Sequence, residues 1–519
     1  MSRTSILTIV VAVMASLLEI IDTSIVNVAL PSMMGNLGAT LEDISMVVTG
    51  YAIANAIVLP VAAWLGERIG RRTYFLGCIL AFTLASLACG VAPNLEFLIF
   101  FRIVQGLAGG ALLPTSQTLI YEQFPKEKAG MAGALFGMSV MIGPTLGPTL
   151  GGYLTDQFGW RMIFNVNLPL GIIALLIGYS AVQNPSYHRA ANEKRPPLDS
   201  IGLALLVLGV GCLQFVLERG QSDDWFASRA IVINAIIAAA SLPTFVWWEL
   251  KVKNPIINVR LFKEAIVANG VLLMACLGFF LYGVVFLLPV FLNRMYNYDA
   301  TQVGMMFIPG SLITAMLMPF IGKMMQAKVN PKILIFIGLT SIELCLLMMS
   351  YFSPLSPPEA IYRMLYMRGF ALAFLFVPIN SSILSQFTGQ AMGQVAGLLN
   401  LFRQIGGSMG IALVATLLNS NSRQNYLDLV SRVSLLNPAT QTAYSQLTGG
   451  FANKMSENMG FATGHDAALR VLNYKVYNQV FMLSFLQLVA TMMIIFSLVY
   501  IPYFFLRLKR NAVTVVDAH

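Results

Sequence analysis

Long apolar runs, separated by short polar segments, fill almost the whole chain. A helix needs about 20 mostly apolar residues to cross a bilayer, and runs of about this length occur fourteen times. The predicted spans are residues 5–30, 44–64, 74–92, 95–121, 130–154, 160–182, 198–218, 229–249, 266–292, 301–325, 333–353, 359–388, 394–418 and 478–502. The pattern predicts an all-α membrane protein. Because the number of spans is even, both termini are expected on the same side of the bilayer.

The first span differs from the others because it carries two carboxylates near its middle, Glu19 and Asp22. On a helix these acids share one stripe with Thr23 and Asn27, since the four residues recur at spacings of three and four. A charged side chain at the bilayer centre costs about 2.5–3.5 kcal/mol. The stripe is therefore expected to face a bundle interior or a wet cavity. Two interpretations stay open: the acids mark an ion or substrate pathway, or they form a satisfied packing network.

The composition excludes several classes of protein. With 57% hydrophobic and only 11% charged residues, the chain lies outside the range of soluble domains, in which about a quarter of residues are charged. All five cysteines fall within predicted spans without a CxxC pair, so we expect neither a disulfide framework nor a metal site. The three histidines lie outside the spans, and there is no nucleotide-binding loop or nucleophile–base pattern. We therefore expect no enzyme activity and no cofactor.

The net charge of +9 raises the question of a nucleic-acid partner. If the N-terminus is cytoplasmic, nineteen Lys and Arg residues fall in inner segments and only four in the short outer loops: Arg161, Arg219, Arg229 and Arg294. This asymmetry is the positive-inside rule. The basic excess therefore orients the protein in a lipid bilayer, with both termini cytoplasmic, and requires no nucleic acid.

Further charged and polar residues lie inside other spans. Arg102 sits one to two turns inside the fourth span, ahead of Gln105. Two positions are open to the Arg102 side chain. It extends to the outer interface, or it reaches the acids of the first span and lowers a carboxylate pKa. In the second half, Glu343 and Arg403 also lie within spans, and Glu343 is either a cavity residue or a member of a local pair. The candidates for lining a substrate cavity are Thr23, Asn27, Gln105, Glu343 and Arg403.

Two glycine-containing segments stand out by their spacing. The first is a tight basic turn between the second and third spans, formed by Gly66, Glu67, Arg68, Gly70, Arg71 and Arg72. The second lies in the fifth span and contains Gly143, Pro144, Gly147, Pro148, Gly151 and Gly152. Glycine at every fourth position lets helices approach closely, and proline removes backbone donors and bends a helix. We expect a close-packed, bent fifth helix that acts as a hinge between two bundles.

These segments resemble motifs of the major facilitator superfamily, in its fourteen-helix branch of drug:proton antiporters of the EmrB/QacA type. The stretch from Asp22 to Pro31 is similar to the first-helix signature of that branch, and the basic turn to the superfamily loop between helices two and three. Arg102 with Gln105 resembles the fourth-helix motif, 143–152 the antiporter motif, and 160–169 the opening of the sixth helix. The resemblance implies a fold of two six-helix bundles plus two inserted helices.

An internal duplication agrees with this plan. Residues 60–72 align with 319–331, Gln105-Gly106 aligns with Arg368-Gly369 to within a residue, and Pro114 aligns with Pro378. The expected organisation is an N-terminal six-helix bundle at 1–182, a linker with inserted helices at 183–265, and a C-terminal six-helix bundle at 266–519. Within the last unit, the polar segment 419–477 is expected to be a long outer loop with one helix after Asn437-Pro438.

The leading hypothesis is proton-coupled efflux of small amphiphilic drugs or toxic compounds by alternating access. Two halves would rock about a central cavity, and protonation of Asp22, shared with Glu19 and sensed by Arg102, would bias the two faces. The alternatives are an exporter of one specific metabolite, or a transport-inactive receptor or scaffold on the same fold. The resemblance implies the bacterial inner membrane, with a proton gradient instead of a cofactor. If the host has an outer membrane, a periplasmic adaptor and an outer-membrane channel are expected partners.

Overall fold

The computed structural model describes residues 2–184, 199–434, 437–454 and 461–505. The first half contains α1 (Arg3–Leu37), α2 (Leu41–Ile69), α3 (Arg71–Gly90), α4 (Leu95–Glu122), α5 (Ala129–Phe158), α6 (Met162–Asn165) and α7 (Asn167–Ala181). The inserted pair is α8 (Ser200–Arg219) and α9 (Arg229–Lys251). The second half contains α10 (Ala265–Tyr296), α11 (Ala300–Gln326), α12 (Pro331–Ser350), α13 (Pro358–Leu384), α14 (Gly389–Arg432), α15 (Pro438–Lys454), α16 (Phe461–Ser497) and α17 (Tyr500–Phe505).

The prediction of fourteen spans is confirmed within these ranges, where fourteen segments are long and apolar enough to cross a membrane. The short α6 and α7 together make the sixth span, which runs over Met162–Ala181. Large apolar side chains remain exposed on the outside of the helices, for example Leu176 at 71% and Met316 at 77%. Such exposure is expected of surfaces that contact lipid instead of water.

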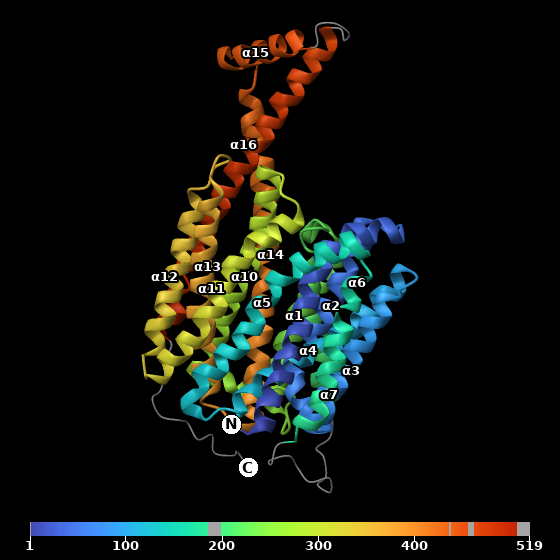
Figure 1. The fold of residues 1–519 in the computed structure, drawn as a ribbon, viewed down its shortest axis with the longest axis vertical. Coiled ribbons are helices and arrows are strands. Elements are labelled where there is room, and N and C mark those ends of the chain that lie inside the picture. Colours follow the sequence, from blue (N-terminus) through green and yellow to red (C-terminus); the bar gives the residue numbers. More distant parts are fainter. Residues whose placement is uncertain (1, 185–198, 435–436, 455–460, 506–519) are drawn as a thin grey trace.

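The helices form two groups that correspond to the two halves of the chain. In Figure 1, α1–α4, α6 and α7 lie on one side and α10–α13 on the other. Glycines allow the two groups to pack backbone against backbone. A β-carbon on Gly130 of α5 would lie 2.8 Å from the carbonyl oxygen of Gly322 in α11. A second line of contact joins α2 and α14, where a β-carbon on Gly397 would lie 2.7 Å from the Leu59 carbonyl oxygen.

The segment 419–477, predicted as a long outer loop with one helix, is mostly helical in its described part. α14 continues to Arg432, α15 spans Pro438–Lys454, and α16 begins at Phe461. Figure 1 shows these helices projecting beyond the rest of the molecule. The extensions are polar, so a hydropathy pattern cannot detect them, yet they pair with each other: the rings of Tyr426 and Tyr477 lie 5.0 Å apart. The helix expected after Asn437 is present as α15.

The division into three units at 1–182, 183–265 and 266–519 remains a prediction. Most of the proposed linker, residues 185–198, lies outside the described residues. The inserted helix α8 packs on α9, where a β-carbon on Gly209 would lie 2.7 Å from the Leu242 side chain. It also approaches α2, since a β-carbon on Gly211 would lie 3.4 Å from the Ile57 side chain.

Candidate functional site

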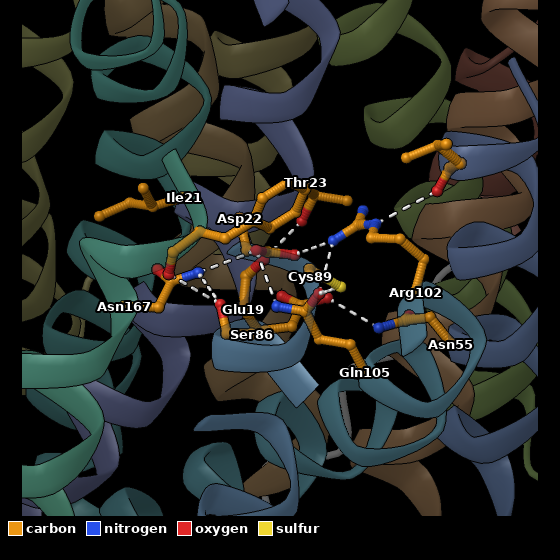
Figure 2. Close-up of polar contacts among 12 residues, drawn as sticks. Glu19, Ile21, Asp22, Thr23, Asn55, Ser86, Cys89, Arg102, Gln105 and Asn167 are labelled. Carbon is orange, nitrogen blue, oxygen red and sulfur yellow. Dashed lines mark hydrogen bonds and ion pairs between the residues drawn. The ribbon is translucent and has the colours of Figure 1, made fainter. Parts of the chain in front are cut away.

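A buried ion pair joins the first and fourth spans. Nη1 of Arg102 in α4 donates to Oδ2 of Asp22 in α1 over 2.5 Å. Both side chains are shielded from solvent, with exposures of 0% for Asp22 and 1% for Arg102. Figure 2 shows the two side chains pointing toward each other within the first bundle. Of the two alternatives for Arg102, the structure therefore favours the one in which it reaches an acid of α1.

The second carboxylate oxygen of Asp22 is also satisfied. Its Oδ1 accepts hydrogen bonds of 2.9 Å each from the amides of Gln105 in α4 and Asn167 in α7. Asn167 also donates to the Ser86 hydroxyl at 3.1 Å, and Ser86 donates to the Phe164 carbonyl at 2.9 Å. The Asp22 carboxylate thus connects four spans of the first bundle, which Figure 2 shows around it.

Arg102 is held on all sides by the same bundle. Its Nε donates to the Val47 carbonyl at 3.2 Å and its Nη1 to Gln105 at 2.9 Å, while the guanidinium lies 4.1 Å from the centre of the Tyr51 ring. Removing one partner of a buried ion pair costs about 3–5 kcal/mol, because the other charge stays buried without compensation. Any event that neutralises Asp22 therefore changes the energy of the α1–α4 contact by a large amount.

Glu19 lies one turn from Asp22 but has a different environment. Its Oε1 accepts a 2.9 Å hydrogen bond from Asn55 of α2, whereas its Oε2 is buried without a hydrogen-bond partner among the described residues. Glu19 therefore keeps one unpaired oxygen, whereas both oxygens of Asp22 are paired within the first bundle.

The other candidates for a substrate cavity are found in different places. Gln105 belongs to the Asp22 site, and Thr23 donates to the Glu19 carbonyl of its own helix at 2.6 Å. Asn27 is exposed. Glu343 is half-buried between α12 and α16, where Ser497 donates to it at 3.3 Å. This contact favours the local pair for Glu343, one of its two predicted alternatives.

Arg403 belongs to a polar chain between the two bundles. Gln117 of α4 donates to Asn380 of α13 at 2.8 Å, and Asn400 of α14 donates to Gln117 at 2.7 Å. Arg403 donates to Asn400 at 3.4 Å and to the Tyr282 hydroxyl at 3.5 Å. These side chains are 0–4% exposed, apart from Tyr282, which is half-buried. Direct amide contacts thus close the space between the bundles at this level.

The basic turn ties the ends of three helices together. Gly70 joins α2 to α3 with φ of +102°, a conformation that residues with a β-carbon rarely adopt. Arg71 forms a two-pronged ion pair with Glu122 at the end of α4, at 2.7 and 2.6 Å. Arg72 donates to the Tyr179 carbonyl of α7 at 2.6 Å. A cavity of about 50 Å³ beside this turn is lined from both halves of the chain, by Gly66, Glu67 and Arg71 and by Gly389, Gln390 and Gly393.

The glycines of α5 are the contact surface for α1. A β-carbon on Gly143 would overlap Ile20, one on Gly147 would overlap Ser24, and one on Gly151 would lie 2.8 Å from the Ile25 carbonyl oxygen. Ser24 also donates to the Gly143 carbonyl at 3.1 Å. Gly152 faces the other bundle, where a β-carbon would lie 2.7 Å from the Thr301 hydroxyl. The helix is continuous through Pro144 and Pro148. α5 therefore contacts both the helix that carries the acids and the opposite half.

Sequence reasoning missed several side chains that contact the candidate residues or join the two bundles. Asn55, Ser86 and Glu122 are single polar residues in otherwise apolar or terminal segments, and nothing in their spacing links them to Asp22 or Arg71. Asn167 stands in the sixth-helix segment that resembles the family, which is the one signal that singled it out. Gln117 and Asn380 are unremarkable in sequence because their significance arises only when the two halves meet.

The described residues contain no group of three or more His, Cys, Asp or Glu side chains placed to hold a metal ion. All five cysteines are free. The charged chemistry of the site is thus that of carboxylates, guanidinium groups and amides. In such a set, protonation of a carboxylate breaks its ion pair with an arginine, and deprotonation restores the pair.

Comparison with known proteins gives a consistent result. A family model described as Major Facilitator Superfamily matches residues 12–411. Multidrug export protein EmrB of Escherichia coli K12 is 35% identical over 437 residues, which cover 84% of each chain. Fatty acid resistance protein FarB of Neisseria gonorrhoeae is 34% identical over 406 residues, covering 78% of this chain and 79% of that protein.

Two solved structures share the arrangement of helices at low sequence identity. The human organic anion transporter MFSD10 (TETRAN) is 14% identical with a TM-score of 0.59, covering 94% of this chain and 100% of that chain. A bacterial homolog of the human lysosomal transporter Spinster, in an inward-facing and unoccupied conformation, is 15% identical with a TM-score of 0.54, covering 98% and 100%. These two similarities concern the fold alone.

Proposed function

This chain belongs to the major facilitator superfamily, and from its buried Asp22–Arg102 pair we propose that it exports amphiphilic small molecules in exchange for protons. Membership confirms the predicted family branch and major facilitator fold, and it makes the chain a secondary transporter that is neither an enzyme nor dependent on a cofactor. The chain is a multi-pass membrane protein with fourteen spans. We also propose the bacterial inner membrane with cytoplasmic termini, on the basis of bacterial relatives and the distribution of Lys and Arg.

The observation that carries the proposal is the 2.5 Å contact between Arg102 and Asp22. A proton on Asp22 removes the charge that Arg102 requires, so the two helices no longer gain the energy of the pair. Deprotonation restores it. The geometry of this ion pair can differ between the inward-open and outward-open states. Protonation of Asp22 then shifts the equilibrium between the two states by the difference in the energy of the ion pair. Glu19 lies one turn from Asp22 on the same helix, so the two acids share this role in our proposal.

We propose that the conformational change runs along α5 and the basic turn. α5 contacts α1 through Gly143, Gly147 and Gly151, and it contacts the second bundle through Gly130 and Gly152. A displacement of α1 would therefore be transmitted through α5 to the opposite half. The Arg71–Glu122 pair fixes the inner end of α4 to α3, so that the first bundle moves as one body.

The proposed cargo is amphiphilic because the chain lines its interior with apolar side chains around a few buried charges. Glu19, with one free carboxylate oxygen, favours cationic compounds. Arg403, whose Nε is buried without a partner among the described residues, favours anionic ones. The names of two relatives, multidrug export protein EmrB and fatty acid resistance protein FarB, support an amphiphilic cargo.

The test is transport by the purified full chain in proteoliposomes with an imposed pH gradient. The panel contains cationic dyes, neutral drugs and medium-chain fatty acids, each measured with and without an uncoupler. We expect uptake into inside-acidic vesicles, driven by outward proton flux through protein in the appropriate orientation, that the uncoupler abolishes. Transport that persists unchanged with the uncoupler would contradict proton coupling. Movement of a single panel member would favour the specific metabolite exporter, and movement of none would favour the receptor or scaffold.

We further propose that the projecting helices of 419–477 contact a periplasmic adaptor, which in turn recruits an outer-membrane channel. Figure 1 shows these helices projecting beyond the rest of the molecule, and Asn425 in the extension of α14 donates to Ser484 of α16 at 2.9 Å. The test removes α15 (Pro438–Lys454) and measures chemical crosslinking to a co-expressed adaptor alongside vesicle transport. Loss of crosslinking with retained vesicle transport supports the role, and unchanged crosslinking contradicts it.

A further inference from the structure

A second acid, Glu218, lies where the inserted helix α8 meets α14. Its Oε1 accepts a 2.8 Å hydrogen bond from the Ser408 hydroxyl of α14 and a 2.9 Å hydrogen bond from the Gln214 amide of its own helix. Gln214 also donates to the Ser408 oxygen at 2.6 Å. Gln214 and Ser408 are 1% and 7% exposed. The three side chains thus form a closed triangle that connects the inserted helix to the second bundle.

The next residue of α8 connects the same helix to the first bundle. Arg219 donates to the Glu42 carbonyl at 2.9 Å and to the Ser45 hydroxyl, both near the start of α2. Beyond it, Trp225 donates to the Thr416 hydroxyl of α14 at 2.9 Å. By the predicted topology, this end of α8 lies on the outer side of the membrane. One short segment therefore bridges both bundles at the outer side, where they must separate to open outward.

Among the described residues, Glu218 has no cationic partner. Arg219, the next residue, forms an ion pair with Asp223 at 2.9 Å. Other charged groups on the packed elements α2, α9 and α14 and on the adjoining turn are engaged elsewhere, exposed or remote: Glu42 and Asp43 are exposed at the start of α2, Asp224 lies in the turn, Arg229 is exposed at the start of α9, and Arg403 contacts Tyr282 and Asn400. The Glu218 charge is therefore stabilised by the hydroxyl and the amide alone.

We propose that Glu218 is a second proton-dependent group of the transport cycle, whose carboxylate holds α14 against the inserted helix until a proton from the outer side releases it. The inference rests on the proposed function. A hydrogen bond to an ionised carboxylate is about twice as strong as one to a neutral acceptor. The bridge is therefore strongest when Glu218 is ionised, and proton uptake weakens it. Acidification on the outer side would therefore favour outward opening.

The experiment measures the opening directly and separately from transport. Spin labels replace Asn36 at the outer end of α1 and the 92% exposed Leu355 between α12 and α13, after the five native cysteines have been changed to alanine or serine. Electron-spin distance distributions of the full chain in nanodiscs are recorded from pH 8 to pH 5. We expect the long-distance population of the unmodified chain to grow as the pH falls.

Glu218→Gln keeps the size of the side chain and removes its charge. We expect this variant to shift toward the acidic distance distribution and to depend less on pH than the parent, with an open-to-closed ratio at pH 8 about tenfold above that of the parent, the effect of losing a bond to a charged group. Ser408→Ala, which keeps the acid and removes its partner, should raise the same ratio. Glu96→Gln, an exposed acid at the outer end of α4, is the matched control and should behave like the parent.

A Glu218→Gln distribution that still follows pH as the parent does would overturn the inference, and so would a parent distribution independent of pH. These outcomes are distinct from a failure of the proposed function, which appears as absent proton-driven transport in vesicles. If Glu218→Gln transports with a normal pH profile, export is coupled to protons and Glu218 takes no part in the coupling.

Discussion

The two halves of the protein share their packing but differ in their charges. In the first half, α4 approaches α2 through Gly106, where a β-carbon would lie 2.5 Å from the Tyr51 carbonyl oxygen. In the second half, α13 approaches α11 through Gly369, where a β-carbon would overlap the Gly310 carbonyl oxygen. The internal alignment places these glycines at equivalent positions. Duplication has thus preserved the close helix contacts of the bundle.

The two halves differ in their buried charged residues. α1 supplies Asp22 to Arg102, whereas α10, its counterpart, contains no Asp or Glu. Arg368 in the second half is 4% exposed, and its guanidinium lies 5.4 Å from the centre of the Phe307 ring. Its Nε lacks a hydrogen-bond partner in the described part of the chain. We infer that protons bind mainly in the first half and that the second half follows by a change of conformation.

The largest expected effect of a single substitution is at the charge that distinguishes the halves. Asp22→Asn should abolish uptake driven by a pH gradient, because Asn cannot exchange a proton and leaves Arg102 without its counter-charge. Asp22→Glu, which keeps a titratable group, should retain partial transport. The measurement is proteoliposome flux normalised to inserted protein. Wild-type flux in Asp22→Asn would show that Asp22 is not an essential proton site.

The two buried arginines give a direct comparison of stability. Arg102→Gln leaves Asp22 buried and unpaired, so we expect the free energy of unfolding to fall by about 3–5 kcal/mol. Arg368→Gln removes a buried charge that has no acidic partner, so its effect should be near zero or stabilising. Thermal unfolding in detergent with matched lipid checks both. Equal destabilisation by the two substitutions would remove the electrostatic difference between the halves.

The equivalent glycines test the shared packing. Gly106→Ala and Gly369→Ala each force a methyl group against a backbone carbonyl, so both should destabilise by about 1–3 kcal/mol. Gly35→Ala is the control, since nothing lies within 4 Å of a β-carbon there. The same thermal unfolding assay applies. A loss at one glycine alone would mean that the halves pack differently.

The smallest effect is expected at Glu343. Its observed contact is a 3.3 Å hydrogen bond from the exposed Ser497 at the edge of the second half. Glu343→Gln preserves the ability to accept that bond, so stability should change by no more than about 0.5 kcal/mol and transport should stay close to that of the parent. Proteoliposome flux across the drug panel is the readout. A selective loss of cationic substrates would restore Glu343 as a cavity residue.

Much of this arrangement could be predicted from the sequence, because membrane spans are long, apolar and forced to be helical. The cost of a buried charge also placed Glu19 and Asp22 in a protein interior and left Arg102 as their possible partner. The same argument could not choose a partner. Asp22 has Arg102 and two amides, while Glu19 has Asn55, and this choice depends on helix rotation that periodicity does not fix.

Other features were beyond the reach of hydropathy. The extended ends of α14 and α16 are polar helices outside the membrane, where composition resembles that of a loop. The Arg71–Glu122 pair joins residues 51 positions apart, and the Gln117–Asn380 contact joins residues 263 positions apart. Neither can be read from local spacing, since each depends on how the bundles are assembled.

The seam at Gly130 and Gly322 has a consequence for the speed of the cycle. The two main chains meet directly at these glycines, beside the β-carbon of Met325. Side chains that interlock must be freed and reordered on every turnover, at an entropic cost for each. We therefore expect the chains to part at this point with a lower kinetic barrier than an interlocked contact would impose.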